Sequence, residues 1–114
     1  MPFARIDGRK VVAGFERHTV KGSGTDGENT AQIDWPDGTI EWTIKNAGAA
    51  SVQLGHTLAR AEGAEYLAVA TGASFDGSSE GSIFVYNPNV ADNVIEIYYA
   101  RAAVSAAALT ITDA

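Results

Sequence analysis

Apolar and polar residues alternate along most of this chain in short segments, with Gly, Asn, Asp and Ser clustered between them. A period of two is typical of strands that have one buried and one solvated face. Segments of this kind, rich in β-branched and aromatic residues, occur at 10–15 with a continuation at 19–21, then at 31–35, 40–45, 52–54, 66–70, 83–86, 94–99 and 109–112. We therefore predict about eight short strands.

The segment 31–45 has the clearest pattern. Apolar residues alternate on both sides of a central Pro-Asp-Gly sequence: Ala31, Ile33 and Trp35 before it, and Ile40, Trp42 and Ile44 after it. Proline presets φ for a turn, and glycine accepts a positive φ. The pattern predicts a β-hairpin in which both tryptophans lie on the apolar side and Trp42 is buried.

Other segments lack a strand pattern. Residues 22–27 and 72–81 are rich in Gly, Ser, Thr and Asp and are expected to be loops. Residues 100–108 are rich in alanine, which favours helix, but they lie between two clear strands. We expect a strand end followed by a loop there, with a single helical turn as the alternative.

The overall pattern predicts an all-β fold. No long amphipathic helix interrupts the strands, so a β-sandwich or a closed barrel is expected. One-sided alternation favours antiparallel sheets, and thus an antiparallel β-sandwich of the jelly-roll or immunoglobulin-like kind. With 114 residues, the chain has the length of one domain. We assign this domain to residues 10–114 and a basic N-terminal leader to residues 1–9.

Charge is divided unequally along the chain, whose net charge is −6. Residues 1–21 contain five basic and two acidic residues, whereas residues 22–114 contain three basic and twelve acidic residues. A basic leader on an acidic body suggests docking on an acidic surface of the same or a neighbouring subunit. Arg5, Arg9 and Lys10 are then the candidate interface residues. The alternative is a solvated strand that is basic by chance.

Several function classes are not supported by the sequence. An acidic chain is a poor match for nucleic acid. There are no cysteines for disulfides or thiolate sites, and no apolar stretch approaches the length of a membrane span. The two histidines, His18 and His56, lie in no catalytic motif, and no Gly-x-Ser-x-Gly sequence is present. We expect a protein that is not an enzyme and needs no cofactor.

Two kinds of ligand remain as candidates. The acidic loop residues Asp26, Glu28, Asp34 and Asp37 are oxygen donors suited to calcium, but their spacing does not match an EF-hand. An exposed aromatic ring can stack on a sugar. Tyr98 is the best candidate for stacking, because it is out of phase with Ile97 and is expected on the polar side of its strand.

The chain resembles small β-sandwich proteins that decorate or build phage virions and tails. The resemblance rests on acidic strands rich in Ala, Gly, Ser and Thr, on Thr-Ile-Lys-Asn-Ala-Gly-Ala-Ala-Ser-Val at 43–52, and on Ala-Leu-Thr-Ile-Thr at 108–112. It implies a structural protein of a virion or similar assembly, such as a capsid decoration or tail component. Such a protein is made in the host cytoplasm and acts through protein contacts in a homo-oligomer. The alternative is an extracellular carbohydrate- or cell-surface-binding module.

Overall fold

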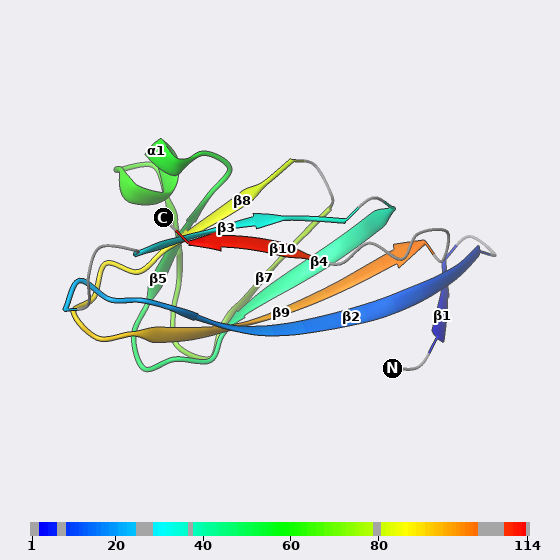
Figure 1. The fold of residues 1–114 in the computed structure, drawn as a ribbon, viewed down its shortest axis with the longest axis horizontal. Coiled ribbons are helices and arrows are strands. Elements are labelled where there is room, and N and C mark those ends of the chain that lie inside the picture. Colours follow the sequence, from blue (N-terminus) through cyan, green and yellow to red (C-terminus); the bar gives the residue numbers. More distant parts are fainter. Residues whose placement is uncertain are drawn as a thin grey trace.

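The fold is known from a computed structural model, which describes residues 3–6, 9–24, 29–36, 38–78, 81–102 and 109–113. Within these ranges the chain forms ten strands and one short helix, in two antiparallel sheets packed face to face (Figure 1). The expected antiparallel β-sandwich is confirmed, although ten strands are described where the sequence indicates about eight.

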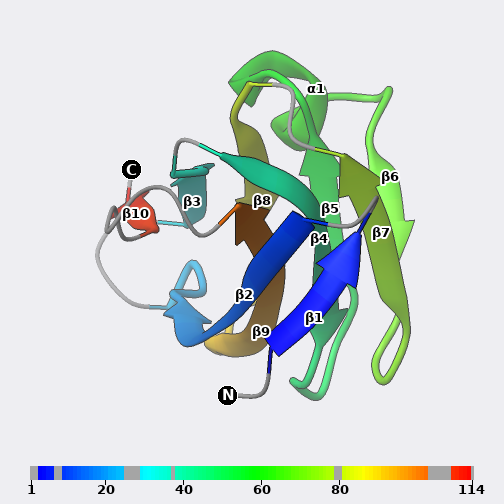
Figure 2. The ribbon, with the colours of Figure 1, turned by 90° about the vertical axis from the view of Figure 1, so that its right-hand side faces the viewer.

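The two sheets have five strands each. Sheet A contains, in spatial order, β1 (Phe3–Ile6), β2 (Arg9–Val20), β9 (Asn93–Ala102), β4 (Thr39–Asn46) and β7 (Ser74–Ser78). Sheet B contains β10 (Thr110–Asp113), β3 (Thr30–Asp34), β8 (Ile83–Tyr86), β5 (Val52–Gly55) and β6 (Leu67–Val69). Strands β2 and β9 have 12 and 10 residues, so sheet A extends past sheet B at the end that carries β1 (Figures 1 and 2).

Strands β2 to β9 are wound as a jelly roll. Their sheet orders are β2-β9-β4-β7 and β3-β8-β5-β6, and the chain changes sheet at every connection except the one between β5 and β6. Eight strands in two such interleaved sheets form a jelly roll. An immunoglobulin-like sandwich keeps its first two strands in one sheet, whereas β2 and β3 lie in different sheets. Strands β1 and β10 extend the two sheets beyond β2 and β3.

The expected hairpin at residues 31–45 is wrong. Strand β3 lies between β10 and β8, and strand β4 lies between β9 and β7 in the other sheet. The residues between them form a corner, where the amide and hydroxyl of Thr39 donate to the carbonyl oxygen of Pro36 at 3.2 and 2.7 Å. Alternation cannot distinguish a corner from a hairpin, because each strand turns one apolar face to the core in both.

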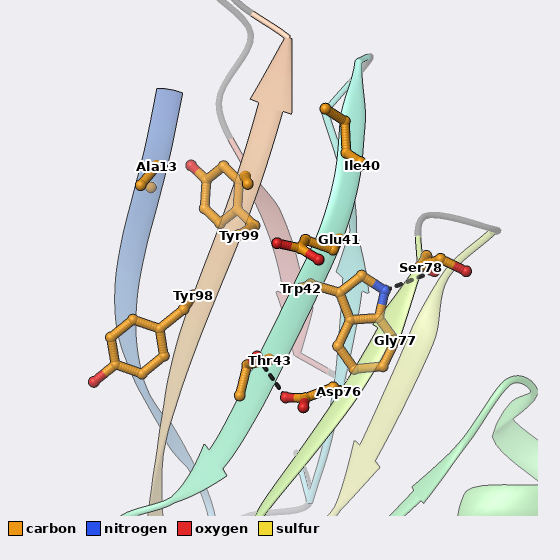
Figure 3. A pocket seen from close by; sticks show the side chains of 12 residues that line it. Ala13, Ile40, Glu41, Trp42, Thr43, Asp76, Gly77, Ser78, Tyr98 and Tyr99 are labelled. Atoms are coloured by element: carbon orange, nitrogen blue, oxygen red, sulfur yellow. Dashed lines mark hydrogen bonds between the residues drawn. The ribbon is translucent and has the colours of Figure 1, made fainter. Parts of the chain in front are cut away.

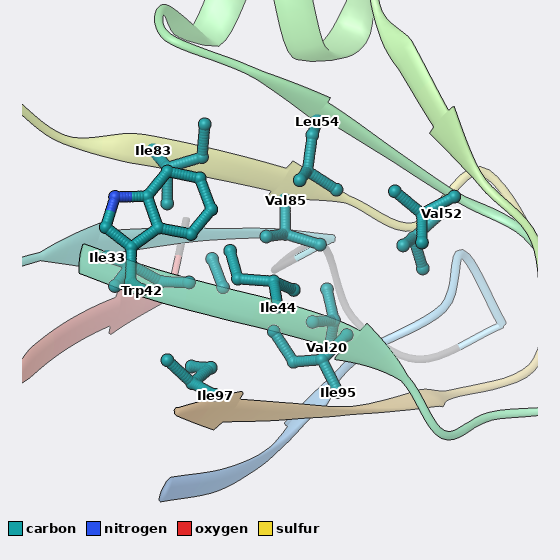
Figure 4. Packing of buried hydrophobic residues seen from close by; sticks show 12 residues of the cluster. Val20, Ile33, Trp42, Ile44, Val52, Leu54, Ile83, Val85, Ile95 and Ile97 are labelled. Atoms are coloured by element: carbon teal, nitrogen blue, oxygen red, sulfur yellow. The ribbon is translucent and has the colours of Figure 1, made fainter. Parts of the chain in front are cut away.

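The core lies between the two sheets (Figure 4). Its buried residues are Val20, Ala31, Ile33, Trp42, Ile44, Val52, Leu54, Val69, Ile83, Val85, Ile95 and Ile97. The predicted burial of Trp42 is confirmed, since only 3% of this residue is exposed. The rings of Trp35 and Trp42 stack with centroids 5.0 Å apart. This stack joins the end of β3 to β4, and so links the two sheets.

The predicted loop at residues 72–81 is wrong in part, because strand β7 lies within it. Its composition disfavours a strand, but Phe75 pairs with Ile44 and its ring packs 5.9 Å from that of Trp42. Gly77 lies opposite Trp42, and a Cβ at this position would be 2.3 Å from the indole. Tertiary pairing therefore determines this strand in spite of its low intrinsic propensity.

A short helix, α1 (Leu58–Glu62), is also absent from the sequence-based prediction. Thr57 caps it, with its hydroxyl accepting a hydrogen bond from the amide of Arg60 at 3.1 Å. The side chain of Gln53 in β5 donates to the carbonyl of Ala61 at 2.7 Å. These two bonds hold five residues that would be too few to form an independent helix.

Buried asparagines close one end of the sandwich. Asn46, Asn87 and Asn93 are 0%, 0% and 2% exposed. Asn93 donates to the side-chain oxygen of Asn46 at 2.8 Å, and Asn46 donates to the carbonyls of Ala50 and Val69 at 2.7 and 2.9 Å. Asn87 donates to one carbonyl in β2 and one in the β8–β9 loop. Because each of these amides is hydrogen-bonded, the loops at this end are held in fixed positions.

Candidate functional site

The outer face of sheet A is the surface that no described element covers (Figure 2). Its side chains alternate with core residues such as Ile97 on β9 and Ile44 on β4, so they point away from sheet B. Strand register aligns them across β2, β9, β4 and β7 in three rows: Ala13, Ala100, Glu41 and Ser78; Phe15, Tyr98, Thr43 and Asp76; Arg17, Glu96, Lys45 and Ser74.

A hollow of about 650 Å³ lies over the first two rows (Figure 3). We call it the outer hollow, and its described lining comprises Ala13, Gly14, Ile40, Glu41, Trp42, Thr43, Asp76, Gly77, Ser78, Tyr98, Tyr99 and Ala100. Its floor is low because the first row carries the short side chains of Ala13, Ala100 and Ser78. Its volume lies within the range typical of small-ligand sites.

The rings of Phe15 and Tyr98 form an exposed aromatic pair beside this hollow. Their centroids are 5.0 Å apart, and the two residues are 46% and 39% exposed. The expectation that Tyr98 lies on the polar side of β9 therefore agrees with its position. Phe15 comes from β2 and Tyr98 from β9, so only the register of these strands brings them together.

Tyr98 is also close to a carboxylate. Partial burial raises the pKa of its phenol above the usual 10.0, and the charge of Glu96 and a hydrogen bond of 3.3 Å to it raise that pKa further. Glu96 is in turn held by Arg17, whose Nη1 lies 2.9 Å from its carboxylate. The phenol therefore stays protonated and can donate a hydrogen bond at neutral pH.

Two carboxylates line the outer hollow itself. Asp76 accepts a hydrogen bond of 2.6 Å from the hydroxyl of Thr43, its neighbour on β4. Trp42 positions this part of β7 from the core side, because its indole N–H donates to the carbonyl of Ser78 at 2.9 Å. The side chain of Glu41 is exposed. It lies in the first row, and Asp76 lies in the second row, opposite Thr43.

The sequence indicates only part of this site. Alternation of Glu41, Thr43 and Lys45 with the apolar residues of the same segment places them on the outside of β4, as the structure shows. Asp76 lies in the segment expected to be a loop, so nothing local indicates that it faces Thr43. Phe15 is a large apolar residue in phase with Ala13 and Arg17. This position in the pattern is the sequence signal for an apolar residue on the outer face.

The other sequence-based candidates lie elsewhere. At Arg5, Arg9 and Lys10 the structure describes only the backbone, in β1 and at the start of β2. Asp26, Glu28 and Asp37 fall outside the described residues. Asp34 lies in a second hollow of about 380 Å³, at the corner between β3 and β4, and accepts hydrogen bonds from Gln32 and Ser82.

Neither a cluster of metal ligands nor a membrane-spanning helix is found in the described ranges. Across them, no three His, Cys, Asp or Glu side chains lie close enough together to hold a metal ion. In the same part of the chain, no helix has the length and apolar character to cross a membrane. Comparisons with protein-family models, with curated proteins and with solved structures find no match.

Proposed function

We propose that this protein is a non-enzymatic structural component of a virion or similar assembly, such as a capsid decoration or tail protein. It acts through protein contacts made by the outer face of sheet A. The observation that carries the proposal is the exposed pair of Phe15 and Tyr98 on a sheet face that no described element covers. Aromatic residues are enriched in the buried centres of protein interfaces.

Jelly rolls occur in viral capsids, but also in lectins and cupins, so the fold is compatible with the proposal without selecting it.

Sedimentation of the purified protein over a concentration series tests the proposal. We expect self-association or binding to a preformed particle, without any added sugar. Replacing both Phe15 and Tyr98 by serine should weaken association about tenfold, since aromatic anchors carry much of the energy of an interface. Tyr66→Ser is the matched control, because Tyr66 is an aromatic residue 42% exposed at the other sheet. It should associate like the wild type.

The second candidate is a carbohydrate- or cell-surface-binding module acting outside the cell. The specific observation in its favour is that the ring of Tyr98 borders a hollow lined by the hydrogen-bonding side chains of Glu41 and Asp76. A strictly monomeric wild type that binds on a glycan array, and loses that binding in Tyr98→Ala, would replace the assembly role by this one.

A further inference from the structure

The described lining of the outer hollow is negatively charged. Glu41 and Asp76 are the charged residues in its described lining, which contains no lysine, arginine or histidine. Asp76 accepts one hydrogen bond from a neutral hydroxyl. For Glu41, the described part of the chain provides no hydrogen bond and no ion pair. A surface of this kind attracts cations and repels anions.

On this face, the basic residues with described side chains, Arg17 and Lys45, are positioned around a different carboxylate. Arg17 forms an ion pair with Glu96 at 2.9 Å. Lys45 lies directly opposite Glu96 in the register of β4 and β9, in the row farthest from Glu41. The row that contains Glu41 has Ala13, Ala100 and Ser78 as its other members, and none of them is charged. Among the described residues, Glu41 therefore has no basic partner.

The shape of the hollow suits a long cationic side chain. Ala13 and Ala100 provide an apolar floor for a methylene stem, and the half-exposed ring of Tyr98 provides a π-face at one wall. Arginine and lysine interact favourably with such a face, and arginine can also pair with a carboxylate through two parallel hydrogen bonds. A stem, a ring and two carboxylates together match one basic side chain.

The distribution of charge in this chain indicates where such a side chain comes from. Residues 1–21 contain five of the eight basic residues, and the rest of the chain is strongly acidic. The backbone of β1 and the start of β2 lies at one end of the long axis, at the edge of sheet A and beyond sheet B (Figures 1 and 2). A segment in that position is accessible to a neighbouring molecule.

We infer that a second copy of this chain docks its basic N-terminal segment, through Arg5, Arg9 or Lys10, into the outer hollow between Tyr98, Glu41 and Asp76. This inference rests on the proposed assembly role and names the partner and the contact. The two surfaces in the contact are different parts of the chain, so the interface is heterologous. Repetition of a heterologous contact produces a ring or a filament rather than an isolated pair.

Two complementary variants test the contact in the full-length protein. Glu41→Gln with Asp76→Asn removes the charge of the hollow and keeps the side-chain sizes. Arg5→Gln, Arg9→Gln and Lys10→Gln remove the charge of the N-terminal segment. Each variant alone should self-associate about tenfold more weakly than the wild type, because the electrostatic complementarity is lost. Mixed together they should form a complex that stops at one molecule of each, since only one intact contact is possible.

Glu65→Gln is the matched control, because it removes one exposed carboxylate from the loop between α1 and β6, which leads into sheet B. It should associate like the wild type. Association of the wild type should also weaken as ionic strength rises, since exposed charges are screened over about 10 Å at 0.1 M salt. Circular dichroism of each variant confirms that a loss of association is not a loss of folding.

The outcomes separate this inference from the proposed function. Undiminished association of the Glu41 and Asp76 variant, or a mixture that forms no complex, overturns the inference and leaves the assembly role standing. A wild-type protein that stays monomeric and binds no particle overturns both. Binding of a glycan by the hollow, lost in Glu41→Gln, would assign the site to a sugar instead.

Discussion

At the scale of single residues, the inner and outer faces of sheet A are coupled through the same strands. Trp42 fills the core beneath the hollow and bonds to Ser78 at its rim. Gly77 leaves room for its indole. Tyr99 packs in the same way over Gly14 on β2, where a Cβ would lie 2.3 Å from the phenol ring. The floor of the outer hollow therefore depends on glycines that accommodate aromatic rings on the opposite face.

Trp42→Ala should strongly destabilise the protein. Truncating a buried tryptophan costs about 3–5 kcal/mol, because apolar contacts are lost and a cavity remains. Denaturant unfolding should therefore show a lower midpoint for this variant. Tyr66→Ala removes a half-exposed aromatic ring that lies outside the core cluster, and should change stability by less than about 1 kcal/mol. An unchanged midpoint in Trp42→Ala would show that the indole does not support the core.

The phenol of Tyr98 should titrate later than an ordinary tyrosine. Its pKa is raised above 10.0 by partial burial and by Glu96, so the folded state holds this proton more tightly than the unfolded state. Its contribution to stability is fully present below pH 10 and is lost as the pH rises through the folded-state pKa. The difference in phenolate absorbance between wild type and Tyr98→Phe isolates its titration. Glu96→Gln should move the pKa back down, and a curve unaffected by this change would rule out the influence of Glu96.

At the scale of elements, the sequence predicts strands well where apolar and polar residues alternate strongly. It fails where pairing with a neighbouring strand makes a segment of low strand propensity extended. The segments 83–86 and 94–99 are found as strands because β-branched and aromatic residues alternate there. Strand β7 is missed because Ser74, Asp76 and Gly77 have low strand propensity, and only β4 beside them makes them extended. Three residues of the described lining of the outer hollow, Asp76, Gly77 and Ser78, are missed with it.

One hydrogen bond between side chains ties strand β10 to the opposite sheet. His18 on β2 lies 2.7 Å from the carboxylate of Asp113 on β10, which is an edge strand of sheet B. Asp113→Asn should loosen β10 locally, so that the amides of residues 110–113 exchange hydrogen faster. Global stability should fall by less than about 1 kcal/mol, as is usual for a partly exposed pair. Arg17→Gln, which breaks the ion pair between Arg17 and Glu96, should leave this exchange unchanged. Equal exchange in wild type and Asp113→Asn would show that β10 is held by its pairing with β3 alone.

At the scale of the whole molecule, the pattern of the sequence determines the class of fold but not its winding. Every strand of the sandwich needs one apolar face, whatever its neighbours are. Residues 31–45 illustrate this, because the same alternation fits a hairpin and the corner that the structure shows. The winding follows from long-range pairing of strands such as β2 with β9, and no local feature of either strand specifies it.

That pairing has a consequence for how the protein is made. Val20 at the end of β2 lies opposite Asn93 at the start of β9, so β2 lacks its partner on that side until residues 93–102 have been synthesised. The β1–β2 and β4–β7 parts of sheet A are joined only through β9, so they cannot form one sheet before β9 has been synthesised. We therefore expect the protein to fold cooperatively and late in synthesis. Folding should also be slow, as is usual for proteins dominated by non-local strand pairing. During synthesis the apolar faces of β2, β3 and β4 remain uncovered, and in this period the chain is most exposed to aggregation or to capture by a chaperone.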